Sequence, residues 1–209
     1  MNTRDSSSLA STIIKAVWCS IALGLVVQAA IVIATTLNKQ TLLPDTAQKV
    51  SWSLLVCTAL AIGNAVAKSR IPVVGIVGLL AAPAAFVIAK TVQKSLSQGA
   101  SAGASIPTGV EMAIVKAVEY GLFGALVAWV SKRERLSLYL LVGAALGAFT
   151  AAYVVVRSMQ GNAEIATNAL IARAINELLF PIGCAFVLWF TSNAGRLLAR
   201  EQAPATSQQ

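Results

Sequence analysis

The stretch "AAFVIAKTVQK" at Ala84–Lys94 occurs in similar form at two other places in the chain. An earlier copy reads "AAIVIATTLNK" at Ala29–Lys39, and a later copy reads "AAYVVVRSMQG" at Ala151–Gly161. In each copy a run of small and branched apolar residues ends in polar residues that include an amide. A second apolar segment follows each copy, so the pattern predicts a repeated unit of two segments.

The composition of the chain indicates the solvent in which those segments lie. Of 209 residues, 57% are hydrophobic and 11% are charged, and the mean hydropathy is +0.75. Soluble domains carry about 25% charged residues. The segments are apolar on all sides, whereas strands of a membrane barrel alternate in polarity. The sequence therefore predicts an all-α, polytopic membrane protein.

Six apolar segments are long enough to cross a hydrocarbon core of about 30 Å, at 1.5 Å of helix per residue. They are predicted at Thr12–Thr36, Val50–Ala67, Ile71–Val92, Gly109–Ser131, Leu136–Val156 and Ala166–Thr191. This divides the chain into an N-terminal segment at 1–11, a transmembrane domain of six helices at 12–200 and a disordered tail at 201–209.

Basic residues predict the orientation in the membrane. With a cytoplasmic N-terminus, nine basic residues lie on the cytoplasmic side and five on the other, as the positive-inside rule requires. The nine are Arg4, Lys15, Lys68, Arg70, Lys132, Arg133, Arg135, Arg196 and Arg200, and the five are Lys39, Lys49, Lys90, Lys94 and Arg157. We therefore expect a cell (inner) membrane protein with both termini in the cytoplasm.

The second segment of each pair carries its own similarity. It reads "KVSWSLLV" from Lys49, "KAVEYGLF" from Lys116 and "RAINELLF" from Arg173. Together with the first set of copies, this predicts three parallel helical-hairpin repeats in one bundle, at about 12–68, 70–133 and 136–196. The alternative is coincidence, because sequences made of Ala, Val, Leu and Ile match one another easily.

Four charged residues lie within the predicted spans, where a lone charge is costly. Lys116 and Glu119 are three residues apart, and Arg173 and Glu177 are four apart, so each pair shares a helix face and can neutralise itself. In a structural interpretation, the two basic side chains extend to the outer interface. In a functional one, Lys49 joins Lys116 and Arg173 in a basic ring above the two carboxylates, lining a path for an ion or solute.

Neutral residues in the spans suggest support and packing. Asn64 and Asn176 are candidates for additional ligands on such a path, although buried amides also bond across helices. The G-x-x-x-G motif of Gly143 and Gly147, and Gly78 in the third segment, predict surfaces where helix backbones approach closely.

Several classes of protein are disfavoured. The chain has no histidine, which removes histidine-based metal, haem and acid–base sites, and it has no Walker A, Rossmann or G-x-S-x-G motif. Its three cysteines lie in apolar spans, where they are expected to pack as small hydrophobes without a disulfide framework. We expect no metal, no cofactor and no nucleic-acid partner, because membrane insertion accounts for the positive charge.

Two functions remain in view. The first is a small transporter or channel-like subunit that moves an ion or small polar solute past the intramembrane charges. The alternative is a non-catalytic anchor or assembly subunit of a larger membrane complex. A membrane enzyme is a weaker third, since Glu119 and Glu177 are its only plausible acid–base groups. Expected partners are the lipid bilayer, further copies of the chain or other membrane subunits.

Overall fold

The computed structural model describes residues 3–35, 42–67, 70–97, 107–133, 135–160 and 167–201. Within these ranges the chain forms six α-helices, one short 3-10 turn and no strand. The helices are α1 (Thr3–Ala34), α2 (Leu42–Ala67), α3 (Ile71–Leu96), α4 (Pro107–Val130), α5 (Leu136–Gln160) and α6 (Thr167–Glu201), with the turn η1 (Ser131–Arg133) between α4 and α5.

Each predicted apolar segment coincides with one of these helices, and all are long and apolar enough to cross a membrane. The prediction of an all-helical chain with six such segments is confirmed for the described residues. The helix ends follow local signals: Pro72 stands in the first turn of α3, where its missing N–H costs no hydrogen bond. Pro83 and Pro181 lie inside α3 and α6.

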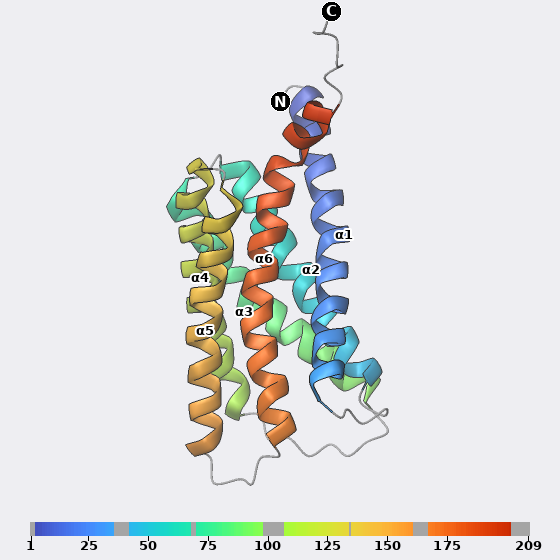
Figure 1. The fold of residues 1–209 in the computed structure, drawn as a ribbon, viewed down its shortest axis with the longest axis vertical. Coiled ribbons are helices and arrows are strands. Elements are labelled where there is room, and N and C mark those ends of the chain that lie inside the picture. The colour runs from blue at the N-terminus through green and yellow to red at the C-terminus, as the bar shows by residue number, and fades with distance from the viewer. Residues whose placement is uncertain are drawn as a thin grey trace, which may run out of the picture.

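Successive helices from α1 to α4 pack extensively against one another, and α5 packs in the same way against α6. Helix α6 also packs against α1, and lighter contacts join α2 to α6 and α4 to α5. In Figure 1 the helix α1 begins and α6 ends at the same end of the bundle, beyond the other helices. Helices α2, α4 and α6 all run away from the opposite end.

Two predicted segments fall partly outside the description. The helix α1 begins at Thr3, so residues 3–11 of the predicted N-terminal segment are helical. The predicted disordered tail lies outside the described residues after Glu201.

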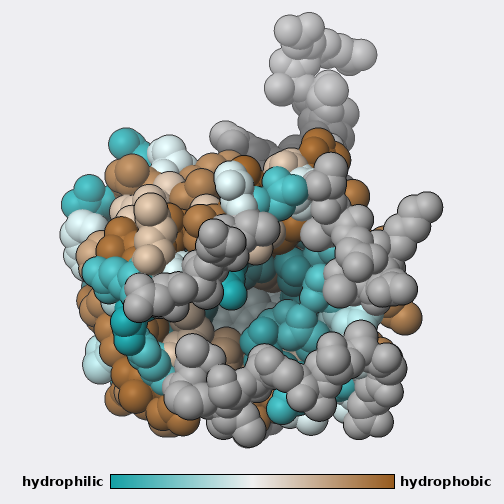
Figure 2. All heavy atoms as spheres, turned by 90° about the horizontal axis from the view of Figure 1, so that it is seen from below, coloured by the Kyte–Doolittle hydropathy of each residue, from teal (hydrophilic) through white to brown (hydrophobic). Residues whose placement is uncertain are grey.

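The outer surface of the bundle is apolar. Many large hydrophobic side chains are exposed along the helices, among them Ile33, Leu80, Leu141 and Phe149. Viewed from the end at which α1, α3 and α5 finish, the periphery is hydrophobic and hydrophilic side chains surround a hollow in the middle (Figure 2). This distribution is the reverse of that in a water-soluble globule and suits a lipid environment.

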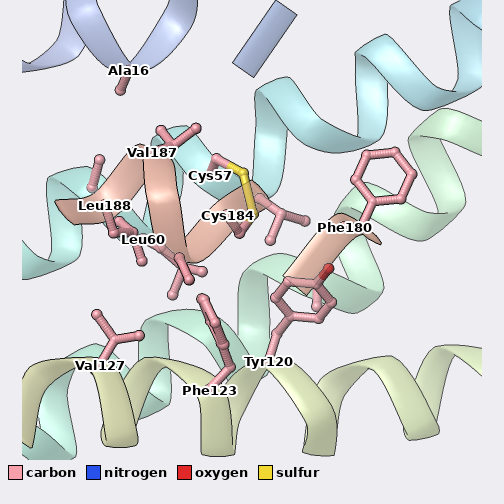
Figure 3. Close-up of a cluster of buried hydrophobic side chains, with 14 of the residues drawn as sticks. Ala16, Cys57, Leu60, Tyr120, Phe123, Val127, Phe180, Cys184, Val187 and Leu188 are labelled. Carbon is pink, nitrogen blue, oxygen red and sulfur yellow. A yellow bond between two sulfur atoms is a disulfide. The ribbon is translucent and has the colours of Figure 1, made fainter. Parts of the chain in front are cut away.

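The inner core lies between α2, α4 and α6. Leu60, Phe123, Val127 and Leu188 are fully buried there (Figure 3), and we refer to these four residues as the apolar plug. The predicted glycines Gly143 and Gly147 of α5 lie in close contact with α6. A Cβ built at Gly143 would lie 2.8 Å from Ile182 Cα, and one at Gly147 would lie 2.8 Å from Leu178 O. The predicted close approach of α5 to a neighbour is therefore confirmed.

The structure corrects the expectation that the cysteines are unpaired. Cys57 of α2 and Cys184 of α6 form a disulfide beside the apolar plug, with Cα atoms 5.6 Å apart (Figure 3). Cys19 is free and half-buried. The pairing was not predicted because 127 residues separate the two cysteines, and only the folded bundle brings their Cα atoms within disulfide range.

Candidate functional site

A buried lysine bonded to two carboxylates is the principal feature of the interior. The ammonium Nζ of Lys116, on α4, donates to Glu119 Oε2 on the same helix at 2.7 Å. It also donates to Glu177 Oε2 on α6. We refer to Lys116, Glu119 and Glu177 as the charge cluster. It joins α4 and α6, two helices that are not neighbours in the sequence.

Aromatic and hydroxyl side chains enclose the charge cluster. The Lys116 ammonium lies 5.8 Å from the ring centroid of Trp52 on α2 and 5.7 Å from that of Tyr120. The two rings meet edge to face at 5.5 Å. Thr150 of α5 lies beside Glu119 and is itself buried. These rings remove water from the ammonium and replace part of its hydration with cation–π attraction.

Burial and bonding show where the Lys116 ammonium lies within the bundle. At 1.5 Å per residue, Lys116 lies about 10 Å along α4 from Gly109, where the apolar span begins, and Glu177 lies about 15 Å along α6 from Thr167. Lys116 is 5% exposed, Glu119 5% and Glu177 8%. The charges are thus satisfied inside the protein, as the sequence predicted for Lys116 and Glu119.

A second polar group lies toward the end of the bundle seen in Figure 2. Lys90 of α3 donates to Gln93 at 3.0 Å, and Gln93 donates to Asp45 of α2 at 2.7 Å. Lys49 also lies near Asp45 and Lys90. We refer to Asp45, Lys49, Lys90 and Gln93 as the polar mouth. It adjoins the charge cluster, because Lys90 is within Coulombic range of Glu177.

The predicted Arg173–Glu177 pair is wrong. Glu177 bonds to Lys116 of another helix, and Arg173 instead donates to Ser158 of α5 at 2.9 Å from an exposed position. A guanidinium near the helix end reaches the surface at a lower desolvation cost than it would incur beside a buried carboxylate.

The predicted basic ring is likewise not formed as three equivalent residues. Lys116 is buried in the charge cluster, whereas Lys49 belongs to the polar mouth and Arg173 is bonded to α5. The side chains that converge on the Lys116 ammonium come from three helices: Trp52 of α2, Glu119 and Tyr120 of α4, and Glu177 of α6.

The two candidate amides lie in different places. Asn176 is next to the charge cluster and donates a long 3.4 Å contact to Glu177 Oε1. Asn64 lies about 18 Å farther along α2 than Trp52, counted at 1.5 Å per residue, and donates to Ser192 of α6 at 3.2 Å. It borders a separate pocket of about 260 Å³ with Thr12 and Thr191.

The apolar plug separates the charge cluster from the Asn64 pocket. Going inward along α4, Glu119 is followed after one turn by Phe123 and after two by Val127. On α2, Trp52 is followed by Leu60, and Leu188 of α6 closes the third side (Figure 3). The interior is therefore polar at the mouth, charged at the cluster and apolar at the plug, with the Asn64 pocket on the far side.

Sequence reasoning missed Trp52, Tyr120 and Thr150 as neighbours of the charge cluster. A signal for two of them was present, because Trp52 aligns with Glu119 and Tyr120 aligns with Glu177 in the repeated segments. Thr150 lies in α5, at a position that carries no comparable signal.

In the described part of the chain, no three His, Cys, Asp or Glu side chains lie close enough together to hold a metal ion. The chemistry available at the charge cluster is accordingly that of carboxylates and an ammonium: binding of a proton or small ion, and hydrogen bonding to a polar solute. No protein-family model, curated protein or solved structure matches this chain.

Proposed function

We propose that this chain is an integral membrane protein of the cell membrane that moves an ion or small polar solute through its charge cluster, as a small transporter or channel-like subunit. The observation that carries the proposal is the buried Lys116, bonded to carboxylates from α4 and α6 within apolar helices. Charges held there are expensive, and in membrane proteins they mark ion and solute pathways.

The arrangement of polarity supports an entry path from one side. A solute would enter where hydrophilic side chains surround the hollow in Figure 2, pass the polar mouth, where Lys49 and Lys90 outnumber Asp45, and reach the charge cluster. The apolar plug then closes the path. Movement across the membrane would require the helices around the plug to separate while the mouth narrows, as in alternating access.

The predicted repeat would fit the same proposal. Trp52, Glu119 and Glu177 approach one ammonium from α2, α4 and α6, which is the arrangement expected if three parallel hairpins surround a common axis. With both termini in the cytoplasm, the polar mouth would face outward.

Flux measurements test the proposal directly. The purified chain would be reconstituted into liposomes, and ion flux driven by a potassium diffusion potential would be followed with entrapped dyes for protons, sodium and chloride. We expect Glu119→Gln and Glu177→Gln to reduce flux to the level of empty liposomes. Glu111→Gln is the matched control, because Glu111 pairs with Arg157 on the surface with about half of both side chains exposed. Undiminished flux in both cluster variants would contradict the proposal.

The assembly-subunit alternative gives a different result. In that case the wild-type chain carries no flux alone, and other membrane subunits accompany it through purification in mild detergent.

A further inference from the structure

The charges of the cluster do not balance. Two carboxylates, Glu119 and Glu177, share the single ammonium of Lys116, and all three side chains are buried. With every group ionised, the cluster carries one excess negative charge inside apolar helices. An uncompensated charge is costly to bury, so such a group tends to neutralise.

The neighbouring side chains do not supply the missing positive charge. Four neutral side chains face the cluster: Trp52 of α2, Tyr120 of α4, Thr150 of α5 and Asn176 of α6. Described charged side chains on the surrounding helices have other positions. They are Lys15 near the far end of α1; Asp45 and Lys49 at the mouth on α2; Lys90 and Lys94 exposed on α3; Glu111 on α4, with Arg157 and the phenol of Tyr153 on α5; and Arg173 on α6, bonded to Ser158.

Lys90 is the nearest alternative and is not bonded to the cluster. It lies within Coulombic range of Glu177, but its ammonium donates to Gln93 and is also attracted by Asp45. An ammonium that is divided between these groups and not bonded to the carboxylate compensates it less than Lys116 does.

Each carboxylate retains an oxygen able to take a proton. Lys116 occupies Oε2 of both. Among the described residues, Glu119 Oε1 is buried without a hydrogen-bond partner, and Glu177 Oε1 accepts the 3.4 Å contact from Asn176. We propose that Glu119 and Glu177 together bind one exchangeable proton beside a permanently charged Lys116, and that this proton is the ion, or the coupling ion, of the path. The inference rests on the proposed function and names its ion.

The step is an acid–base equilibrium without electron transfer. An O–H bond forms between a proton delivered from water at the polar mouth and one carboxylate oxygen, and the charge of the cluster changes from minus one to zero. Release breaks the same O–H bond. Because like charges close together cannot both stay ionised at low cost, the two carboxylates share the proton as a pair.

Infrared spectroscopy of the full chain in detergent or liposomes tests this without any transport assay. At neutral pH we expect the carbonyl band of one protonated carboxyl per chain, shifted in D₂O. It should vanish in Glu119→Gln and in Glu177→Gln, since the remaining carboxylate then balances Lys116 one to one. Glu111→Gln should keep the band, and Lys116→Gln should double it, because both carboxylates lose their counter-ion.

Three results would overturn the inference: no protonated carboxyl in the wild-type chain, a band that persists in both Glu variants, or an undoubled band in a folded Lys116→Gln variant. The first result would indicate that Lys90 or a bound metal cation supplies the charge. If Lys116→Gln does not fold, the two Glu variants still decide the question. A band with the expected behaviour in a chain without flux would contradict the proposed function alone, and flux without a band would contradict the proton alone.

Discussion

Three helices contribute side chains around the single ammonium of Lys116. Glu119 and Glu177 accept its hydrogen bonds, and the rings of Trp52 and Tyr120 lie 5.8 and 5.7 Å away. A desolvated ammonium is tolerated only when such groups replace its water. The cation therefore fixes the position of α4 relative to α6 at the level of the charge cluster.

Removing the cation should destabilise the protein. Lys116→Met leaves two buried carboxylates without a counter-ion, and breaking a buried ion pair from one side typically costs about 3–5 kcal/mol. We expect the free energy of unfolding, measured by denaturant titration in mixed micelles, to fall by about that amount. A triple variant that adds Glu119→Gln and Glu177→Gln removes all three charges and should recover most of the loss. Wild-type stability in Lys116→Met alone would contradict this account.

Sequence spacing predicted only half of the charge cluster. Lys116 and Glu119 lie on one helical turn, so their pairing follows from local geometry. The same local argument favoured Arg173 for Glu177, and it was wrong because Lys116 reaches Glu177 across the bundle. Such a choice depends on which helices are neighbours in space, and hydropathy and charge spacing do not contain that information.

At the scale of the helices, glycine residues allow the backbones of neighbouring helices to approach closely. Gly78 of α3 lies directly against the backbone of Tyr120 on α4, and a Cβ at this position would stand 2.7 Å from the Tyr120 carbonyl carbon. A side chain there must push the two helices apart. Since Glu119 immediately precedes Tyr120, the separation would also move a carboxylate of the charge cluster.

Gly78→Ala should therefore act on both stability and the site. Overpacking a close contact costs typically about 1–3 kcal/mol, and we expect a loss in that range for Gly78→Ala by the same denaturant titration. The matched control is Gly109→Ala in α4, where a Cβ meets nothing within 4 Å. Equal stability of the two variants would show that the contact between α3 and α4 is looser than the structure indicates.

Helix positions were the most predictable feature of the fold. Runs of apolar residues long enough to cross a membrane locate all the described helices, because length and hydrophobicity are properties of each segment alone. The ends were less predictable: α6 continues as helix to Glu201, ten residues beyond the predicted Thr191. Polar residues such as Asn193 continue a helix once it has begun, and hydropathy does not register them.

At the scale of the whole molecule, the polar mouth, the charge cluster and the apolar plug follow one another along the interior, and one covalent link joins the helices around them. The disulfide connects α2 to α6 beside the plug (Figure 3). Residues about the plug must separate for a solute to pass, so any such movement has to keep Cys57 and Cys184 together. In such a movement α1, α2, α5 and α6 would form one unit, and α3 and α4 would form a second unit.

This connection can be tested by cutting the chain. A specific protease site inserted after Arg133, at the exposed end of η1, allows cleavage between α4 and α5. The resulting pieces carry Cys57 on α1–α4 and Cys184 on α5–α6, so we expect them to migrate as one species in denaturing gels without reductant and as two after reduction. Cys57→Ala is the control, which should separate into two pieces under both conditions. Separation of the wild-type pieces without reductant would mean that α2 and α6 are not joined and that the plug can open between them.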